Sequence, residues 1–120
     1  MLNKVIIMGR LTQDPELRST PSGTSVLQFT VAVDRNFQKQ GEEKQADFIN
    51  CVAWKQQAEF IAKHFGKGRM IAIEGRLQSR TYDDKNGTKH YITEVIVENA
   101  SFTGEPKPQD NYSAYGEPTF

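Results

Sequence analysis

Hydrophobic and polar residues alternate along most of the first 103 positions, which is the pattern of half-buried β-strands. Five segments show this alternation, and most are rich in β-branched residues. Turn signals separate them, among them Asp14-Pro15 and an Asn86-Gly87 pair that is typical of a tight β-hairpin. The expected strands cover residues 3–11, 26–33, 47–54, 70–82 and 89–102.

One segment has helical periodicity instead. Between residues 55 and 65, Ala58, Ile61, Ala62 and Phe65 form an apolar stripe with spacings of three and four. The order is therefore three strands, a helix and a two-stranded hairpin. It predicts an all-β OB-fold, a five-stranded Greek-key barrel with one helix between its third and fourth strands. An open α+β sheet is the alternative with the same order of elements.

The chain has 120 residues, 37% of them hydrophobic and 25% charged, which suits one domain with its own core. The periodicity ends after residue 103, and residues 104–120 contain three prolines. We expect a domain over residues 1–103 and a flexible C-terminal tail over residues 104–120.

The single cysteine excludes an internal disulfide framework and favours a reducing cytoplasm. No apolar run is long enough to cross a membrane, and Arg10 interrupts the short apolar stretch near the N-terminus. The 15 basic and 15 acidic residues balance, so any nucleic-acid signal must lie in their local placement.

Patterns typical of catalysis or metal binding are weak. The two histidines and the cysteine lack zinc-type spacing, and the Asn86-Gly87 loop has Tyr82 and Thr93 where a calcium loop needs carboxylates. No serine or cysteine has a nearby base in the sequence. We therefore expect no metal, no cofactor and no enzymatic activity. A nuclease is the enzymatic alternative, but it needs a carboxylate cluster, for which Asp83-Asp84 is a poor substitute.

Aromatic and basic side chains share the faces of the strands that do not carry the small apolar residues. In the third strand Phe48, Asn50 and Trp54 lie opposite Cys51 and its small neighbours. Bases stacking on rings, with phosphates held by arginine and lysine, would explain this pairing, because an unpaired strand offers both flat bases and charges. Each ring taken alone fits a place in the core or in a subunit interface as well as it fits a stacking role. The candidate phosphate contacts from strand parity are Arg10, Arg35, Lys55, Arg76 and Arg80, with Arg18, Lys67 and Lys89 as weaker candidates.

Several long blocks resemble the bacterial and phage single-stranded DNA-binding protein family over residues 1–103. They include NKVIIMGRLTQDPELRSTPSG, FTVAVDR, DFINCVAW and IEGRLQSRTYDDKNGTKHYITEV. The resemblance implies an OB-fold, a homotetramer, and binding of single-stranded DNA without sequence preference in replication, recombination and repair. It places the stacking aromatics at Phe37, Phe48, Trp54 and Tyr82.

The tail departs from this family. Cellular members end in an acidic run followed by Pro-Phe, whereas this chain ends in GEPTF without such a run. The departure argues against recruitment of replication and repair proteins. An OB-fold interaction module of the primosome type is the competing hypothesis, but the long RLQSRTYDDKNGTKHY hairpin, with its basic and aromatic residues, favours an arm that grips DNA.

Overall fold

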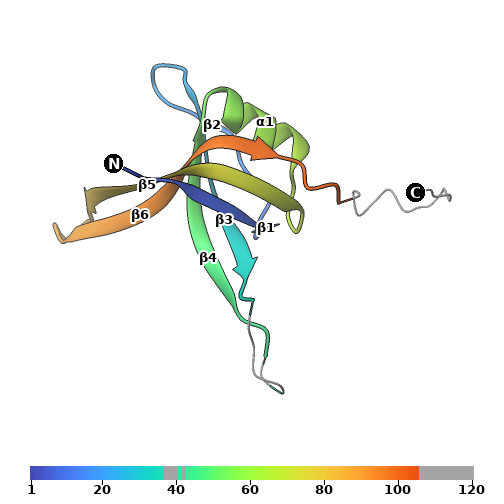
Figure 1. Cartoon of the computed structure of the whole chain (residues 1–120). Helices are drawn as coiled ribbons and strands as arrows, with labels where there is room; N and C mark the ends of the chain where they lie inside the picture. Colours follow the sequence, from blue (N-terminus) through green and yellow to red (C-terminus); the bar gives the residue numbers. More distant parts are fainter. Residues whose placement is uncertain (37–40, 42, 106–120) are drawn as a thin grey trace.

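The alternating segments form strands because each has one apolar face to bury, and these faces enclose a single core. The computed structural model describes residues 1–36, 41 and 43–105. They form a curved sheet with one helix packed against it (Figure 1). The elements are β1 (Val5–Leu11), β2 (Arg18–Ser19), β3 (Ser25–Asp34), β4 (Ala46–Trp54), α1 (Gln56–His64), β5 (Met70–Asp83) and β6 (Lys89–Ser101).

The strand order closes the sheet into a barrel. It runs β1-β5-β6-β4-β3-β2, and β1 also pairs with β3. This additional pairing joins five strands in a ring, to which the two-residue strand β2 is added beside β3. The pairings are antiparallel except for β4 with β6, which is parallel. The predicted OB-fold is confirmed, and the open-sheet alternative is wrong because both edges of β1 are paired.

The core fills the inside of this ring. Leu27 and Val31 of β3 are fully buried, and so is Ile71 of β5, as the alternation predicts. Ile61 of α1 is also fully buried, because the apolar stripe of the helix packs against β3, β4 and β6. Cys51 is 1% exposed, so it belongs to the core.

Two glycines allow the strands to approach each other where the barrel closes. A Cβ atom on Gly9 would lie 2.4 Å from the carbonyl oxygen of Ala32, and one on Gly75 would lie 2.1 Å from that of Ile96. Both distances are far below van der Waals contact with a backbone atom. Any larger residue would push apart the strands that complete the ring.

A β-bulge changes the phase of β6. Glu74 pairs with Asn99 while the next residue, Gly75, pairs with Val97, so that Glu98 has no partner in the ladder. The alternation therefore shifts by one residue, and Ala100 is buried although Val97 is buried as well. The two faces of β6 cannot be followed from one end to the other by simple alternation.

Beyond the barrel, β5 and β6 continue as a two-stranded arm (Figure 1). Every residue of β5 from Arg76 onward is exposed, including Leu77, which shares its strand face with the buried Ile73. Leu77 is 47% exposed because no opposite strand covers the arm. At the tip, the carboxylate of Asp84 accepts hydrogen bonds from the backbone N–H groups of Asn86 and Thr88, both at 2.9 Å.

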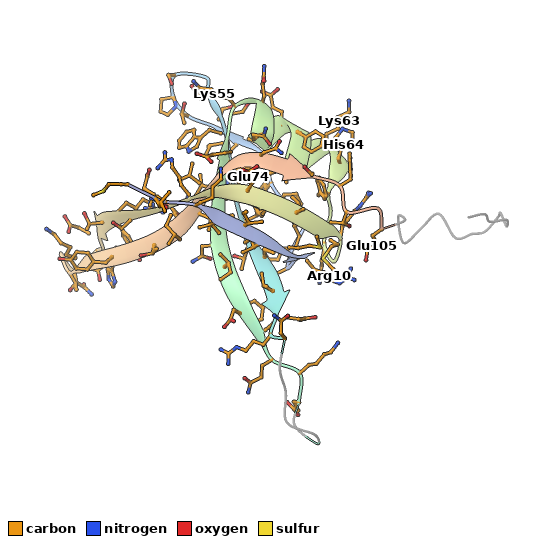
Figure 2. The ribbon with its side chains drawn as sticks, viewed as in Figure 1. Arg10, Lys55, Lys63, His64, Glu74 and Glu105 are labelled. Carbon is orange, nitrogen blue, oxygen red and sulfur yellow. The ribbon has the colours of Figure 1, made fainter. Side chains whose placement is uncertain are left out.

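Of the predicted tail, the structure describes only Gly104 and Glu105. The carboxylate of Glu105 accepts a hydrogen bond from the backbone N–H of Met70 at 3.1 Å and forms an ion pair with Arg10 at 2.7 Å (Figure 2). These contacts lower the pKa of Glu105, chiefly through the Met70 N–H group. Flexibility of the remaining tail stays a prediction.

Candidate nucleic-acid interface

A groove runs over the outer face of β3 and β4. Its volume is about 520 Å³, and the base of the arm forms one wall while the loop after β1 forms the other. The register aligns Thr30 with Asn50 and Ala32 with Phe48, so these four side chains share the outer face. The groove is lined by Thr12, Gln13, Asp14, Pro15, Gln28, Phe29, Thr30, Phe48, Asn50, Cys51, Arg80, Ile92 and Glu94.

Three of the four predicted stacking aromatics are exposed rings. Phe48 is 67% exposed and Trp54 is 42% exposed, on the same face of β4. They are six positions apart along the strand, a distance of about 20 Å. Tyr82 is 44% exposed and lies on the arm. The fourth, Phe37, lies outside the described residues.

A ring that the sequence analysis did not include lies next to Tyr82. The imidazole of His90 stacks on the phenol ring with 5.0 Å between centroids and 17° between planes. Its Nε2 atom lies 2.8 Å from the carboxylate of Asp84, and this contact is the main reason why the pKa of Asp84 is lowered. The hairpin signal at Asn86-Gly87 was sufficient to pair Tyr82 with His90 across the arm.

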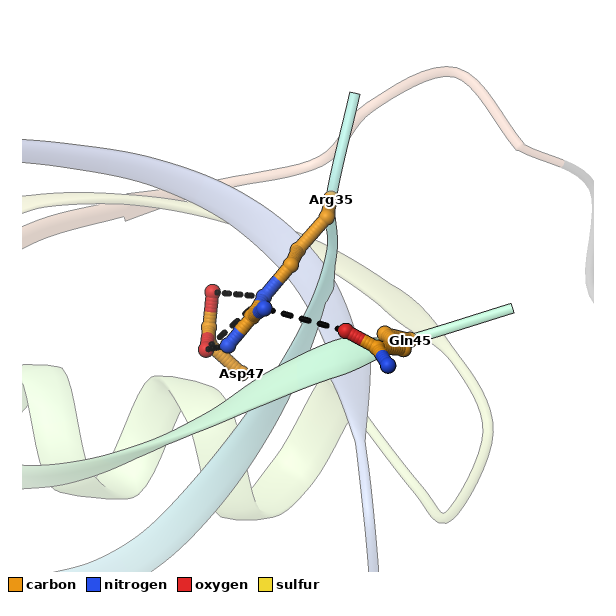
Figure 3. A network of polar contacts seen from close by, with 3 residues as sticks. All are labelled: Arg35, Gln45 and Asp47. Carbon is orange, nitrogen blue, oxygen red and sulfur yellow. Dashed lines mark hydrogen bonds and ion pairs between the residues drawn. The ribbon is translucent and has the colours of Figure 1, made fainter. Parts of the chain in front are cut away.

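Three of the five predicted phosphate contacts form ion pairs with acidic residues: Arg10, Arg35 and Arg80. All three side-chain nitrogens of Arg35 donate hydrogen bonds, two of them to Asp47 and the third to Gln45 (Figure 3). The hydrogen bond between Arg35 and Asp47 raises the pKa of Arg35 and lowers that of Asp47. Arg10 donates to the carbonyl of Gly68 at 2.9 Å in addition to its ion pair with Glu105 (Figure 2).

Arg76 and Lys55 have no acidic partner among the described residues, and Arg80 is bound to its partner through one nitrogen only. Arg76 donates only to Gln78, which is uncharged, at 2.8 Å among the described residues. Lys55 is exposed at the N-cap of α1 and forms no ion pair within the described part of the chain (Figure 2). Arg80 lines the groove and pairs through Nε with Glu94 at 2.8 Å.

None of the three weaker candidates for phosphate contacts lines the groove. Arg18 pairs with Glu16 at 2.7 Å, and Lys89 is exposed at the start of β6. The backbone N–H of Lys67 donates to Asp14 at 2.7 Å and ties the loop that forms one groove wall to the turn after α1. This bond joins residues 53 positions apart, so no local pattern in the sequence predicted it.

The groove also contains a buried thiol and a buried carboxylate. Burial raises the pKa of Cys51 to about 12, with a smaller contribution from the negative charge of Glu94. The thiol is therefore protonated and unreactive at neutral pH. In residues 1–36, 41 and 43–105, no three His, Cys, Asp or Glu side chains gather closely enough to hold a metal ion. None of the described helices has the length and apolar character needed to cross a membrane.

The sequence matches known proteins over the whole barrel. Residues 2–103 match the model of the single-strand binding protein family. Single-stranded DNA-binding protein A of Bacillus subtilis is 50% identical over 107 residues, which cover 89% of this chain and 62% of that protein. The single-stranded DNA-binding protein of Halalkalibacterium halodurans is also 50% identical, with 89% and 63% covered.

A shorter relative, single-stranded DNA-binding protein 3 of Streptococcus agalactiae, is 50% identical over 99 residues, which cover 82% of this chain and 72% of that protein. The chain spans less than two thirds of the length of the two relatives named first. Together with the closed five-stranded barrel, these matches show that the chain belongs to the single-strand binding protein family.

Proposed function

We propose that this protein binds single-stranded DNA without sequence preference, in the groove over β3 and β4. The observation that carries the proposal is the exposure of Phe48 and Trp54 on one strand face, beside a groove whose opposite wall contains Arg80. Large exposed rings at a polar groove suit ligands that have flat apolar faces and charged links between them.

The mechanism follows from the spacing of these groups. Bases stack on Phe48 and Trp54 at the two ends of β4, while Tyr82, backed by His90, offers a further ring on the arm. Each stack contributes about 1–3 kcal/mol, whichever base is present. Lys55, Arg76 and Arg80 contact the phosphates between the stacked bases. Phosphate binding releases counterions, so affinity falls as salt rises.

The relatives' names support the same ligand, because they are called single-stranded DNA-binding proteins. We assign this protein the non-catalytic role of covering single strands during replication, recombination and repair. It would carry out this role on the nucleoid, in the cytoplasm.

We also propose that the protein assembles as a homotetramer, as its family resemblance implies. Ile6 is 76% exposed and Met8 is 54% exposed, both on the outer face of β1. The register places them beside Glu74 and Ala72 of β5, and the ammonium of Lys4 bonds Glu74 at 2.8 Å at the edge of this surface. An apolar surface with a charged rim is typical of a protein interface.

Titration with oligo(dT) at several salt concentrations tests the binding proposal, with the emission of Trp54 as the signal. We expect quenching, and a Trp54→Ala variant should lose about 1–3 kcal/mol of binding free energy when followed with a labelled oligonucleotide. Tyr91→Ala is the matched control, because Tyr91 is 78% exposed but lies on the opposite face of the arm from Tyr82. Unchanged emission together with no retention of the oligonucleotide would refute DNA binding and favour the protein-interaction module.

A further inference from the structure

Glu94 is the one charged residue that is buried within the described part of the chain, with 6% of its surface exposed. It lies on β6, lines the groove, and is therefore an acid at the centre of a surface proposed to bind a polyanion. A buried carboxylate is costly unless it is paired, and an acid beside phosphates repels them. This position calls for an explanation beyond general stability.

The bond between Glu94 and Arg80 uses only one edge of the guanidinium group. The Nε–H group of Arg80 donates to Oε1 of Glu94 at 2.8 Å. The two Nη atoms of Arg80 have no hydrogen-bond partner among the described residues, and the side chain is 40% exposed. Four N–H donors thus remain for a ligand in the groove.

The arginine beside Asp47 shows the opposite arrangement. Arg35 uses Nε and both Nη atoms on Asp47 and Gln45, and Asp47 is itself half exposed. Every nitrogen of that guanidinium already donates to a neighbour, and its Nε edge is held by a carboxylate on both Nε and Nη2. The pair on the groove leaves both Nη groups of its arginine open, and the carboxylate that holds it is almost completely buried.

We propose that Glu94 is a positioning residue of the nucleic-acid interface: it holds Arg80 by Nε so that both Nη groups are presented to a phosphate in the groove. Fixing the guanidinium in advance removes the entropy cost of ordering a long side chain when the phosphate binds. The inference rests on the proposed binding of single-stranded DNA, and it names the residue that organises one of its contacts.

A positioning role and a simple charge effect predict opposite changes in DNA affinity when Glu94 is neutralised. If Glu94 acted only through its charge, its neutralisation would tighten DNA binding and make the salt dependence steeper. If it positions Arg80, neutralisation weakens binding. The slope of log K against log salt then becomes shallower, by up to about 0.7 for one lost phosphate contact on a single strand.

The experiment measures the anisotropy of labelled oligo(dT) with the full chain at four or five salt concentrations. We expect Glu94→Gln to weaken binding by about tenfold, a difference of about 1.4 kcal/mol. Glu94→Asp, which keeps the charge but shortens the side chain, should also weaken it. Asp47→Asn is the matched control: it frees Arg35 from an exposed acid, so its affinity should be unchanged or higher.

A double-mutant cycle isolates the coupling. In an Arg80→Gln background, Glu94→Gln should have no further effect on affinity, because the group that it positions is absent. Arg80→Lys should lose almost as much affinity as Arg80→Gln, since an ammonium cannot be held by one edge and bind by the other. Arg80→Lys and Glu94→Asp still test the positioning role of Glu94 if Glu94→Gln fails to fold, which its thermal melting curve would reveal.

The outcomes separate the two proposals. Absence of binding by the unmodified protein would refute the proposed function itself. Normal binding by the unmodified protein, with tighter binding by Glu94→Gln, additive effects in the cycle or full affinity in Arg80→Lys, would overturn the role of Glu94 alone.

Discussion

Lys55 shows how a single residue links the barrel to its interface. Its backbone has φ 57° and ψ −124°, in a region that L-residues other than glycine rarely occupy. The bend lies between β4 and α1, directly after Trp54, and its N–H group donates to the carbonyl of Ser25 at 2.8 Å. The helix can thus begin at once after the exposed tryptophan, and the cost of this geometry is local strain.

Replacing Lys55 by glycine separates strain from binding. We expect Lys55→Gly to raise the free energy of unfolding by about 1–2 kcal/mol over Lys55→Ala, because glycine adopts this conformation without a Cβ clash. Both variants lose the ammonium group, so both should show the same reduction in oligo(dT) affinity and a salt slope lower by about 0.7. Urea unfolding and salt titrations provide the measurements. Equal stability of the glycine and alanine variants would contradict the strain.

Cys51 connects burial to the pH dependence of stability. An unfolded thiol ionises near its ordinary pKa of 9.0, whereas the folded thiol keeps its proton until about pH 12. The folded state binds this proton more tightly, so its contribution is fully present below pH 9 and is lost as pH rises from 9 toward 12. We expect the unfolding free energy to fall more steeply over this range than in Cys51→Ala, by up to about 1.4 kcal/mol per pH unit. Parallel curves for the two proteins would disprove it.

At the scale of elements, the β5–β6 pair serves both the core and the arm. Its barrel half buries Ile71 and Ile73, and its outer half carries Arg80, Tyr82 and their partners on β6. Gly75 lies at the junction, beside the bulge and against the carbonyl of Ile96. The direction of the arm depends on this junction, where β5 and β6 lie close together.

A methyl group at Gly75 should disrupt this junction. We expect Gly75→Ala to lower the free energy of unfolding by about 2–3 kcal/mol, since its Cβ meets backbone atoms that cannot turn away. Gly66→Ala is the control, because its Cβ would meet only a side-chain oxygen of Asp14, at 3.1 Å. Its cost should stay below about 1 kcal/mol. Chemical denaturation of both variants measures the difference, and equal costs would show that the junction yields easily.

At the scale of the whole molecule, the binding groove and the apolar face lie on different parts of the barrel's outer surface. The groove follows β3 and β4, while Ile6 and Met8 lie on β1 beside β5. The proposed assembly through β1 would therefore leave the rings of β4 uncovered. Copies of the chain joined in this way would present several grooves, along which one strand of DNA could continue.

Met8→Glu tests the assembly surface. We expect this variant to reduce the mass measured by light scattering, because a charge replaces a side chain that is 54% exposed in the monomer and apolar. Leu17→Glu is the matched control, with 44% exposure in the loop before β2. It should keep the assembly intact. An unchanged mass for Met8→Glu, or the same loss in both variants, would remove β1 as the interface.

The sequence predicted the fold well because the patterns that indicate these strands and this helix are local ones. The helix observed at Gln56–His64 was expected at residues 55–65, and the long strands begin and end within two residues of their predicted bounds. Alternation and turn residues depend on neighbours along the chain. The order of the elements predicted a barrel and the family resemblance implied the same OB-fold; the pairing of β1 with β3 confirmed its closure.

The site was predicted less completely, since its polar partners come from distant segments. Strand parity correctly placed Phe48 and Trp54 outside the barrel, but it treated Arg10, Arg35 and Arg80 alike. Only tertiary structure distinguishes Arg35, whose three nitrogens all have partners, from Arg80, which a buried Glu94 holds at a single nitrogen. The sequence determines which rings and charges are present. Contacts between strands decide which of them are available to a ligand, because a hydrogen bond depends on ångström distances that spacing along the chain does not specify.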